Sequence, residues 1–151
     1  MKLSEIPRLE SARILMTGGP KRIAMAFLKI WLGRGYRILA EELPFVVEGN
    51  VFIGNPLKAG GFDAYVIVNP LSRSKSEQKA LYSWLDEKRE KLVLLYETKY
   101  VGDSITRYEI RNFIDYLIAY KRETVGAELV NLYRLREGNV VEKKTLIRRS
   151  L

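Results

Sequence analysis

The chain has 151 residues, of which 47% are hydrophobic, and its 26 Lys and Arg outnumber its 18 Asp and Glu to give a net charge of +8. A chain of this length buries a core of its own, so we expect a single domain over residues 1–151. Cysteine and histidine are absent, which excludes thiolate nucleophiles, imidazole bases, disulfides and zinc sites built on these ligands.

No apolar run reaches the length of about 18 residues that a membrane-spanning helix needs, and the early charges and proline are unlike a secretory signal. We therefore expect a soluble, cytoplasmic protein that does not enter a membrane. Abundant Lys, Arg and Glu with a single glutamine are also typical of heat-adapted proteins, so we expect a thermophilic source. The surplus positive charge lies toward both ends, where it attracts polyanions or serves solubility alone.

Strands and helices alternate in the first half of the chain. Residues 13–17 predict an apolar strand, and Pro20 suits the first turn of a mostly buried helix that ends at Gly33 and Gly35. Residues 36–40 predict a second strand. Residues 45–47 and 51–53 predict a small hairpin.

The second half continues the alternation. The β-branched run over residues 63–70 predicts a central strand buried on both faces, followed by a helix over residues 76–90 and a strand over residues 91–97. A last long helix is predicted to begin at residue 103 or 104, because apolar side chains recur with helical spacing from Ile110 to Ile118. A closing hairpin then follows, with strands over residues 128–136 and 140–147.

Several of these segments carry a family resemblance. A strand over residues 13–17 leads through Gly18-Gly19-Pro20-Lys21 into a helix, and a second turn and strand over residues 33–39 precede Glu41-Glu42. Residues 62–69 supply another strand and residues 129–150 a final hairpin. In this order they resemble the opening, the Walker B strand and the closing hairpin of RecA/KaiC-type ATPases. The resemblance implies an α/β fold with a three-layer, RecA-like, mostly parallel sheet flanked by helices and closed by a C-terminal antiparallel β-hairpin.

The phosphate-binding motif of that family is degenerate here. A working loop reads Gly-x-x-x-x-Gly-Lys-Ser/Thr, because its amides wrap the phosphates, its lysine reaches them and its hydroxyl holds magnesium. This loop is several residues short, Pro20 has no N–H to donate, and Arg22 stands where the hydroxyl belongs. Asn69 stands where the Walker B aspartate belongs. We therefore expect no ATP hydrolysis, no catalytic residue, no metal site and no cofactor.

Two groups of residues could still bind a ligand or act on water. Gly18, Gly19, Lys21 and Arg22 can still attract an anion or nucleotide at the start of a helix, or they simply form a tight strand-to-helix connection. The pair Glu41-Glu42 matches the acidic pair that polarises water in the family, or it ends a strand as a salt-bridge partner.

Three surface features are candidates for binding a partner. The predicted last helix carries a polar and aromatic stripe with a spacing of four residues: Tyr108, Asn112, Tyr116 and Tyr120. Basic residues lie close to it in sequence: Arg107, Arg111, Lys121 and Arg122. Such a pattern can stack bases and contact phosphates, can form a protein interface, or can simply flank the core. The tail holds Lys143, Lys144, Arg148 and Arg149, which reach a polyanion or end the chain in solvent. The loop over residues 72–76 binds a ligand beyond the sheet or caps a helix.

These patterns favour a non-catalytic interaction module whose basic surface binds a protein, RNA or a ribonucleoprotein such as the ribosome. We also expect a homodimer, because hairpin edges need covering. One alternative is a sensor that binds a nucleotide or phosphate without hydrolysis. Another is a magnesium-dependent nuclease or hydrolase that uses Glu41, Glu42 and Asp63.

Overall fold

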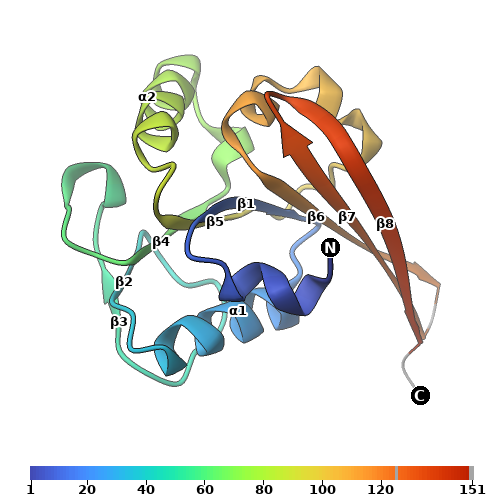
Figure 1. Cartoon of the computed structure of the whole chain (residues 1–151), viewed down its shortest axis with the longest axis horizontal. Coiled ribbons are helices and arrows are strands. Elements are labelled where there is room, and N and C mark those ends of the chain that lie inside the picture. The colour runs from blue at the N-terminus through green and yellow to red at the C-terminus, as the bar shows by residue number, and fades with distance from the viewer. Residues whose placement is uncertain (125, 150–151) are drawn as a thin grey trace.

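The computed structural model of the chain describes residues 1–124 and 126–149 (Figure 1). Eight strands form one sheet in the order β3-β2-β4-β5-β1-β6-β7-β8. The strands are β1 (Ala12–Thr17), β2 (Ile38–Ala40), β3 (Val51–Ile53), β4 (Ala64–Val68), β5 (Leu92–Tyr96), β6 (Tyr116–Thr124), β7 (Ala127–Arg136) and β8 (Asn139–Arg149). All pairs from β3 to β6 are parallel, whereas β7 is antiparallel to both β6 and β8.

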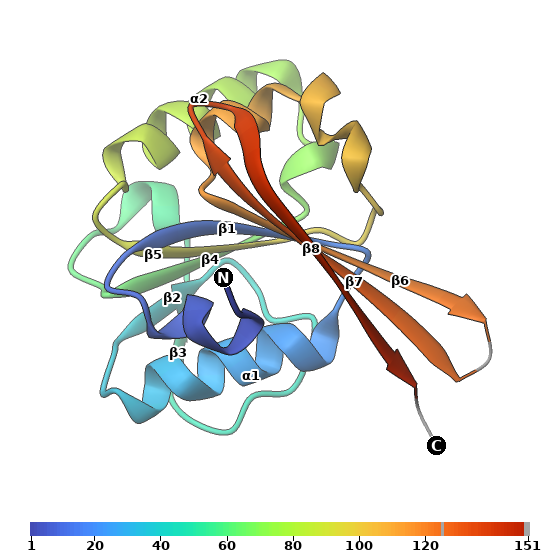
Figure 2. The ribbon, with the colours of Figure 1, turned by 45° about the vertical axis from the view of Figure 1, so that its right-hand side comes forward.

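Helices cover both faces of this sheet (Figure 2). The helices are α1 (Lys21–Gly33) and α2 (Lys75–Glu87), with short 3₁₀ turns η1 (Leu3–Arg8), η2 (Pro56–Lys58), η3 (Pro70–Ser72), η4 (Asp103–Arg107) and η5 (Glu109–Phe113). One core cluster lies under α1 and η1 and includes Phe27 and Trp31. The other lies under α2, η4 and η5 and includes Trp84 and Ile110. The chain is therefore an α/β protein with a mostly parallel sheet and an antiparallel C-terminal hairpin, as expected.

The central strands follow the apolar runs of the sequence. Every residue of β1, β4 and β5 is buried, as expected for strands of a parallel sheet that is covered on both sides. The buried residues include one charged side chain of β1, Arg13, whose guanidinium binds both carboxylate oxygens of Asp115 at 3.0 and 3.1 Å. This pair joins the beginning of β1 to the beginning of β6. No helix of the described residues is both long and apolar enough to cross a bilayer.

The prediction of a last long helix is wrong. The segment forms the turns η4 and η5 and then the nine-residue strand β6, which pairs with β1 on one side and β7 on the other. Leu117, Ile118 and Ala119 are all fully buried, because a strand between two neighbours is covered on both faces. Their apolar run satisfied helical spacing by coincidence, and pairing with distant strands decided the outcome.

The predicted hairpin over residues 45–47 and 51–53 is also wrong. Residues 51–53 form β3, which lies parallel to β2, and residues 45–47 form no strand. Phe45 instead enters the core, where its ring lies 5.3 Å from the ring of Tyr96. The closing hairpin is confirmed, because β7 and β8 pair through a turn in which Glu137 and Gly138 both have positive φ.

Candidate functional site

Four basic side chains from three elements converge on one hollow, which we call the basic hollow. Lys21 and Arg22 come from the first turn of α1, Arg122 from β6 and Arg148 from β8. The hollow has a volume of about 330 Å³. Its other lining residues are Leu3, Gly19, Pro20, Ile23, Tyr120, Glu128, Val130 and Leu146. The lining thus combines an apolar floor with a basic rim, and its single acid leaves a charge of 4 − 1 = +3.

The strand register explains why these side chains meet. Arg122 lies opposite Glu128, which lies opposite Arg148, so the three form one row across β6, β7 and β8. Tyr120, Val130 and Leu146 form the neighbouring row. Residues two apart on a strand share a face, so both rows face the first turn of α1. The side chains come together through the sheet, although they lie far apart in sequence.

Tyr120 is fixed within the hollow. Its phenol donates a hydrogen bond of 2.9 Å to Oε1 of Glu128, so the acid of the lining is already engaged. Burial, and then this hydrogen bond, raise the pKa of Tyr120 above its ordinary value. The ring is therefore neutral at physiological pH and presents an aromatic surface among four cations.

The loop before α1 uses its glycine amides elsewhere. Gly18 N–H donates to the carbonyl of Lys99, and Gly19 N–H donates to the carbonyl of Glu97, both at 3.0 Å. These two amides therefore do not point into the basic hollow as the amides of a phosphate loop would. Whether the loop holds an anion stays a prediction. It would rest on Lys21 and Arg22, whose side chains line the hollow.

The other residues singled out from the sequence, at the ends of β2 and β4 and in the loop before α2, have partners within the chain. Glu41 accepts a hydrogen bond of 2.9 Å from the amide of Val68 and forms an ion pair with Arg73, so it is a salt-bridge partner at the end of β2. Asn69 accepts two hydrogen bonds of 3.1 Å from Thr98. In the loop over residues 72–76, Ser74 caps α2 in a capping box.

The carboxylates of the hydrolase alternative do not meet. Glu41 follows the C-terminal end of β2, and Asp63 precedes the N-terminal end of β4. Because these two strands are parallel, the two carboxylates lie at opposite ends of the strands. Asp63 accepts a hydrogen bond of 2.8 Å from the amide of Arg37. Among residues 1–124 and 126–149, no three acidic side chains gather as a metal site.

The other predicted binding residues are scattered over the molecule. Lys121 and Lys143 point to the opposite face of the sheet, where Lys121 lies 5.7 Å from the ring centre of Tyr100 and Lys143 binds Asp103 at 2.8 Å. Arg107 and Arg111 lie on η4 and η5. Lys144 is exposed on the face of the basic hollow. The side chain of Arg149 lies outside the described part of the chain.

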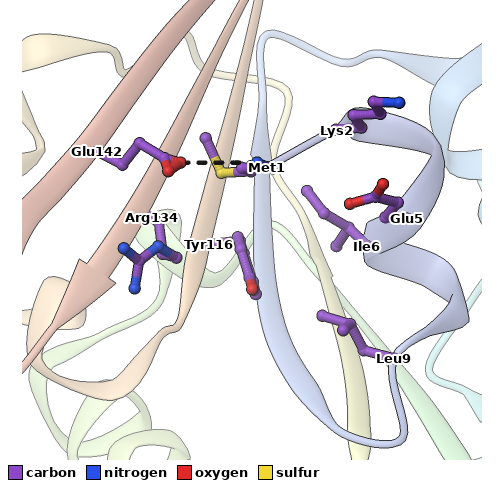
Figure 3. A pocket seen from close by; sticks show the side chains of 8 residues that line it. All are labelled: Met1, Lys2, Glu5, Ile6, Leu9, Tyr116, Arg134 and Glu142. Atoms are coloured by element: carbon purple, nitrogen blue, oxygen red, sulfur yellow. Dashed lines mark ion pairs between the residues drawn. The ribbon is translucent and has the colours of Figure 1, made fainter.

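Tyr116 shares a face with Tyr120 but lines a second hollow (Figure 3). This hollow has a volume of about 220 Å³ and lies between η1 and the hairpin strands. Its charges are mixed, because Lys2 and Arg134 accompany Glu5 and Glu142. The terminal ammonium of Met1 lies 3.8 Å from Glu142. The second hollow therefore lacks the excess positive charge of the basic hollow.

Sequence reasoning missed the floor of the basic hollow. The apolar residues of the lining, and the acid that binds Tyr120, were not proposed as site residues: Leu3, Pro20, Ile23, Val130 and Leu146, with Glu128. Alternation along β7 and β8 was the available signal. A scan of the sequence against protein-family models finds no match, and a search of the curated proteins finds none either.

Proposed function

We propose that this chain is a non-catalytic domain of RecA/KaiC-like fold that binds RNA, free or within a ribonucleoprotein, through the basic hollow. The observation that carries the proposal is the convergence of Lys21, Arg22, Arg122 and Arg148 around the anchored ring of Tyr120. Cations hold a phosphate backbone and aromatic rings stack bases, so the two together suit a nucleic acid better than either does alone.

The concave shape favours a single strand. A base can enter a hollow with an apolar floor and stack on Tyr120, while the phosphates on either side meet the basic rim. The stacked bases of a duplex are enclosed between two backbones and cannot reach a ring at the floor of such a hollow. Single-stranded RNA, or an unpaired loop of a larger RNA, is therefore the proposed ligand.

The proposal that the domain is non-catalytic is supported by the residues at the positions where RecA/KaiC-type ATPases bind phosphate and magnesium and polarise water, because these residues already have partners within the chain. The amides of Gly18 and Gly19 donate to backbone carbonyls, and Glu41 is paired with Arg73. Asn69 supplies an amide where a carboxylate would hold magnesium, and its oxygen already accepts from Thr98. The mostly parallel sheet and the closing hairpin support the RecA/KaiC-like assignment.

Fluorescence anisotropy with a labelled single-stranded RNA of about 12 nucleotides tests the proposal. The double variant Arg122→Ala with Arg148→Ala should weaken binding at least tenfold and reduce the slope of log affinity against log salt by about 1.4, because two phosphate contacts are lost. The variant Tyr120→Ala should weaken binding about tenfold, whereas Tyr120→Phe keeps the ring and most of the affinity.

The matched control is Lys79→Ala, which removes an exposed charge from α2 on the other side of the sheet. It should leave RNA affinity nearly unchanged. An equal loss of RNA affinity in the control and in the double variant would mean that RNA is attracted by the overall positive charge and not by the basic hollow in particular. Absence of RNA binding at low salt would overturn the proposal, and capture of a ribonuclease-resistant partner would favour a protein ligand instead.

A second candidate function is favoured by the position of Lys21 and Arg22 in the first turn of α1. The positive end of the helix dipole lies there beside two cations, so a phosphate group has a place to bind. Calorimetry with ATP, ADP, GTP and inorganic phosphate tests the nucleotide or phosphate sensor. Heat of binding that is lost in Lys21→Ala and kept in Tyr120→Ala would support the sensor, and no heat with any ligand would reject it.

A further inference from the structure

Strand β8 forms one edge of the sheet and is eleven residues long. It pairs with β7 on one side only. Figure 1 shows it along the right-hand side of the molecule, and Figure 2, in which that side comes forward, shows it in front of the other strands. The opposite edge is β3, with three residues. A long edge strand presents a row of N–H and C=O groups that are ready to pair with another strand.

We propose that β8 pairs antiparallel with β8 of a second copy of this chain, with Thr145 on the two-fold axis. Residues opposite one another in an antiparallel pair must have backbone groups that point the same way, and this direction alternates along a strand. A strand that pairs with its own copy therefore places a residue on the axis. The register of the dimer is therefore set by which residue of β8 lies on the two-fold axis.

The regular part of β8 limits the choice. The register against β7 shifts after Arg134, because Arg134 lies opposite Glu142 while Leu135 lies opposite Val140. Val141 is therefore an extra residue, and the regular ladder begins at Glu142. The ladder then continues without a shift to Arg149. Pairing centred on Thr145 or on Leu146 uses seven residues of this stretch, and either centre gives roughly six to eight main-chain hydrogen bonds.

The charges decide between these centres and favour Thr145. With Thr145 on the axis, Glu142 of each copy lies opposite Arg148 of the other, which gives two pairs of opposite charge. Glu142 also lies 3.8 Å from the terminal ammonium of its own chain, and its second carboxylate oxygen can accept from the guanidinium of Arg148. Lys144 then lies opposite Leu146, and its aliphatic stem can cover that side chain. Centring on Lys144 would place two lysines face to face, and centring on Leu146 would place Lys144 opposite Arg148, so both neighbouring registers bring like charges together.

Strand β8 has two features that normally protect an edge strand from pairing: two adjacent lysines and a bulge. Neither blocks this register. Lys143 is already paired with Asp103 at 2.8 Å within its own chain, and Lys144 meets an apolar partner. The bulge at Val141 lies outside the paired stretch. In addition, Ile147, which has 69% of its surface exposed, lies opposite Lys143 of the second copy and loses part of that exposure.

The pairing has a consequence for the proposed RNA site. A two-fold axis at a central residue pair is perpendicular to the sheet, so both copies present their basic hollows on the same side. Arg148 borders its own hollow and meets Glu142 of the other copy, and a guanidinium with five N–H donors can serve both. The dimer then offers two hollows to one RNA, and its affinity for a longer strand exceeds that of one hollow.

Disulfide trapping tests the register directly, because the chain has no cysteine of its own. Thr145→Cys should form a disulfide-linked dimer on mild oxidation, since facing residues of paired strands have the Cα separation that a disulfide needs. Lys144→Cys should not link to itself, but it should link to Leu146→Cys when the two variants are mixed. Lys79→Cys on α2 is the control for random collision.

Light scattering after size exclusion, without RNA, gives the second measurement. The expected mass is twice the 17.5 kDa of one chain. Glu142→Arg should weaken the dimer about tenfold by placing like charges opposite one another twice, and the double variant Glu142→Arg with Arg148→Glu should restore it. A monomer at all concentrations, or a dimer that Lys79→Cys traps as well as Thr145→Cys, would overturn the proposal whatever the result with RNA.

Discussion

Gly18 occupies a position in the loop before α1 where no other residue fits. Its φ is +84°, and a Cβ added there would collide with the backbone oxygen of Tyr120. We therefore expect Gly18→Ala to lower the free energy of unfolding by more than about 2 kcal/mol, through the strained φ and the displaced β6. Urea unfolding measures the change, and the same shift of Tyr120 should weaken RNA binding.

Gly33 at the end of α1 provides the control for this substitution. A Cβ built there meets no atom within 4 Å apart from its chain neighbours and the backbone of its own helix, and the residue is helical. Gly33→Ala should raise stability by up to about 1 kcal/mol, because alanine loses less backbone entropy in a helix. Equal effects of the two substitutions would mean that Gly18 is not held against β6.

At the scale of elements, Asp103 joins η4 to the hairpin. Its carboxylate accepts hydrogen bonds from Lys143 of β8 at 2.8 Å and from the phenol of Tyr133 of β7 at 2.7 Å. These bonds, that of Lys143 first, hold the pKa of Asp103 below its ordinary value of 3.8. A carboxyl group with a lowered pKa in the folded state contributes stability above its unfolded pKa, and this contribution is lost as the pH falls through the folded value.

We expect Asp103→Asn to lower the melting temperature at pH 7 and to have a smaller effect at a pH below 3.8, because the contribution of the carboxylate decreases as the pH falls toward the lowered pKa of the folded state. The shift should be small, because the side chain of Asp103 is 78% exposed and solvent screens its charge. Asp86→Asn is the matched control, because it also removes a surface carboxylate, that of the exposed ion pair between Asp86 and Arg89. A loss in Asp103→Asn that is the same at both pH values would contradict the account.

The elements that sequence predicts well are those whose pattern is local. The apolar runs of β1, β4 and β5, a cap for α2 within residues 72–76 and the turn at Gly138 all follow from a few adjacent residues. Strand β6 is different, because its identity depends on β1 and β7, and residues 110–118 satisfy helical spacing equally well.

The candidate site shows the same limit. Lys21, Arg22, Tyr120, Arg122 and Arg148 were each proposed from sequence, but as separate features of a loop, a helix and a tail. The predicted helical stripe of Tyr108, Asn112, Tyr116 and Tyr120 is wrong, because Tyr108 and Asn112 lie in the turns before β6. Only Tyr116 and Tyr120 share a face, since a spacing of four keeps residues together on a strand as well as on a helix. The convergence on one hollow arises from the order of β6, β7 and β8, which no local pattern contains.

At the scale of the whole molecule, the net charge of +8 acts on both proposed interactions. Two copies whose centres lie about 35 Å apart repel by about 8 kcal/mol in water before screening. Screening leaves about 2 kcal/mol of this at 0.01 M salt and almost none at 0.15 M. The two pairs of Glu142 with Arg148 at about 4 Å lose only about 0.5 kcal/mol in total over this range.

Dimerisation and RNA binding should therefore respond to salt in opposite directions. We expect the dimer to become about tenfold tighter between 0.01 and 0.15 M salt, because relief of the long-range repulsion exceeds the weakening of the ion pairs. RNA affinity should fall over the same range, because each phosphate contact releases counterions. Sedimentation equilibrium measures the first and anisotropy the second. A dimer that dissociates as salt is added would show that short-range ion pairs, and not paired β8 backbones, hold the two copies together.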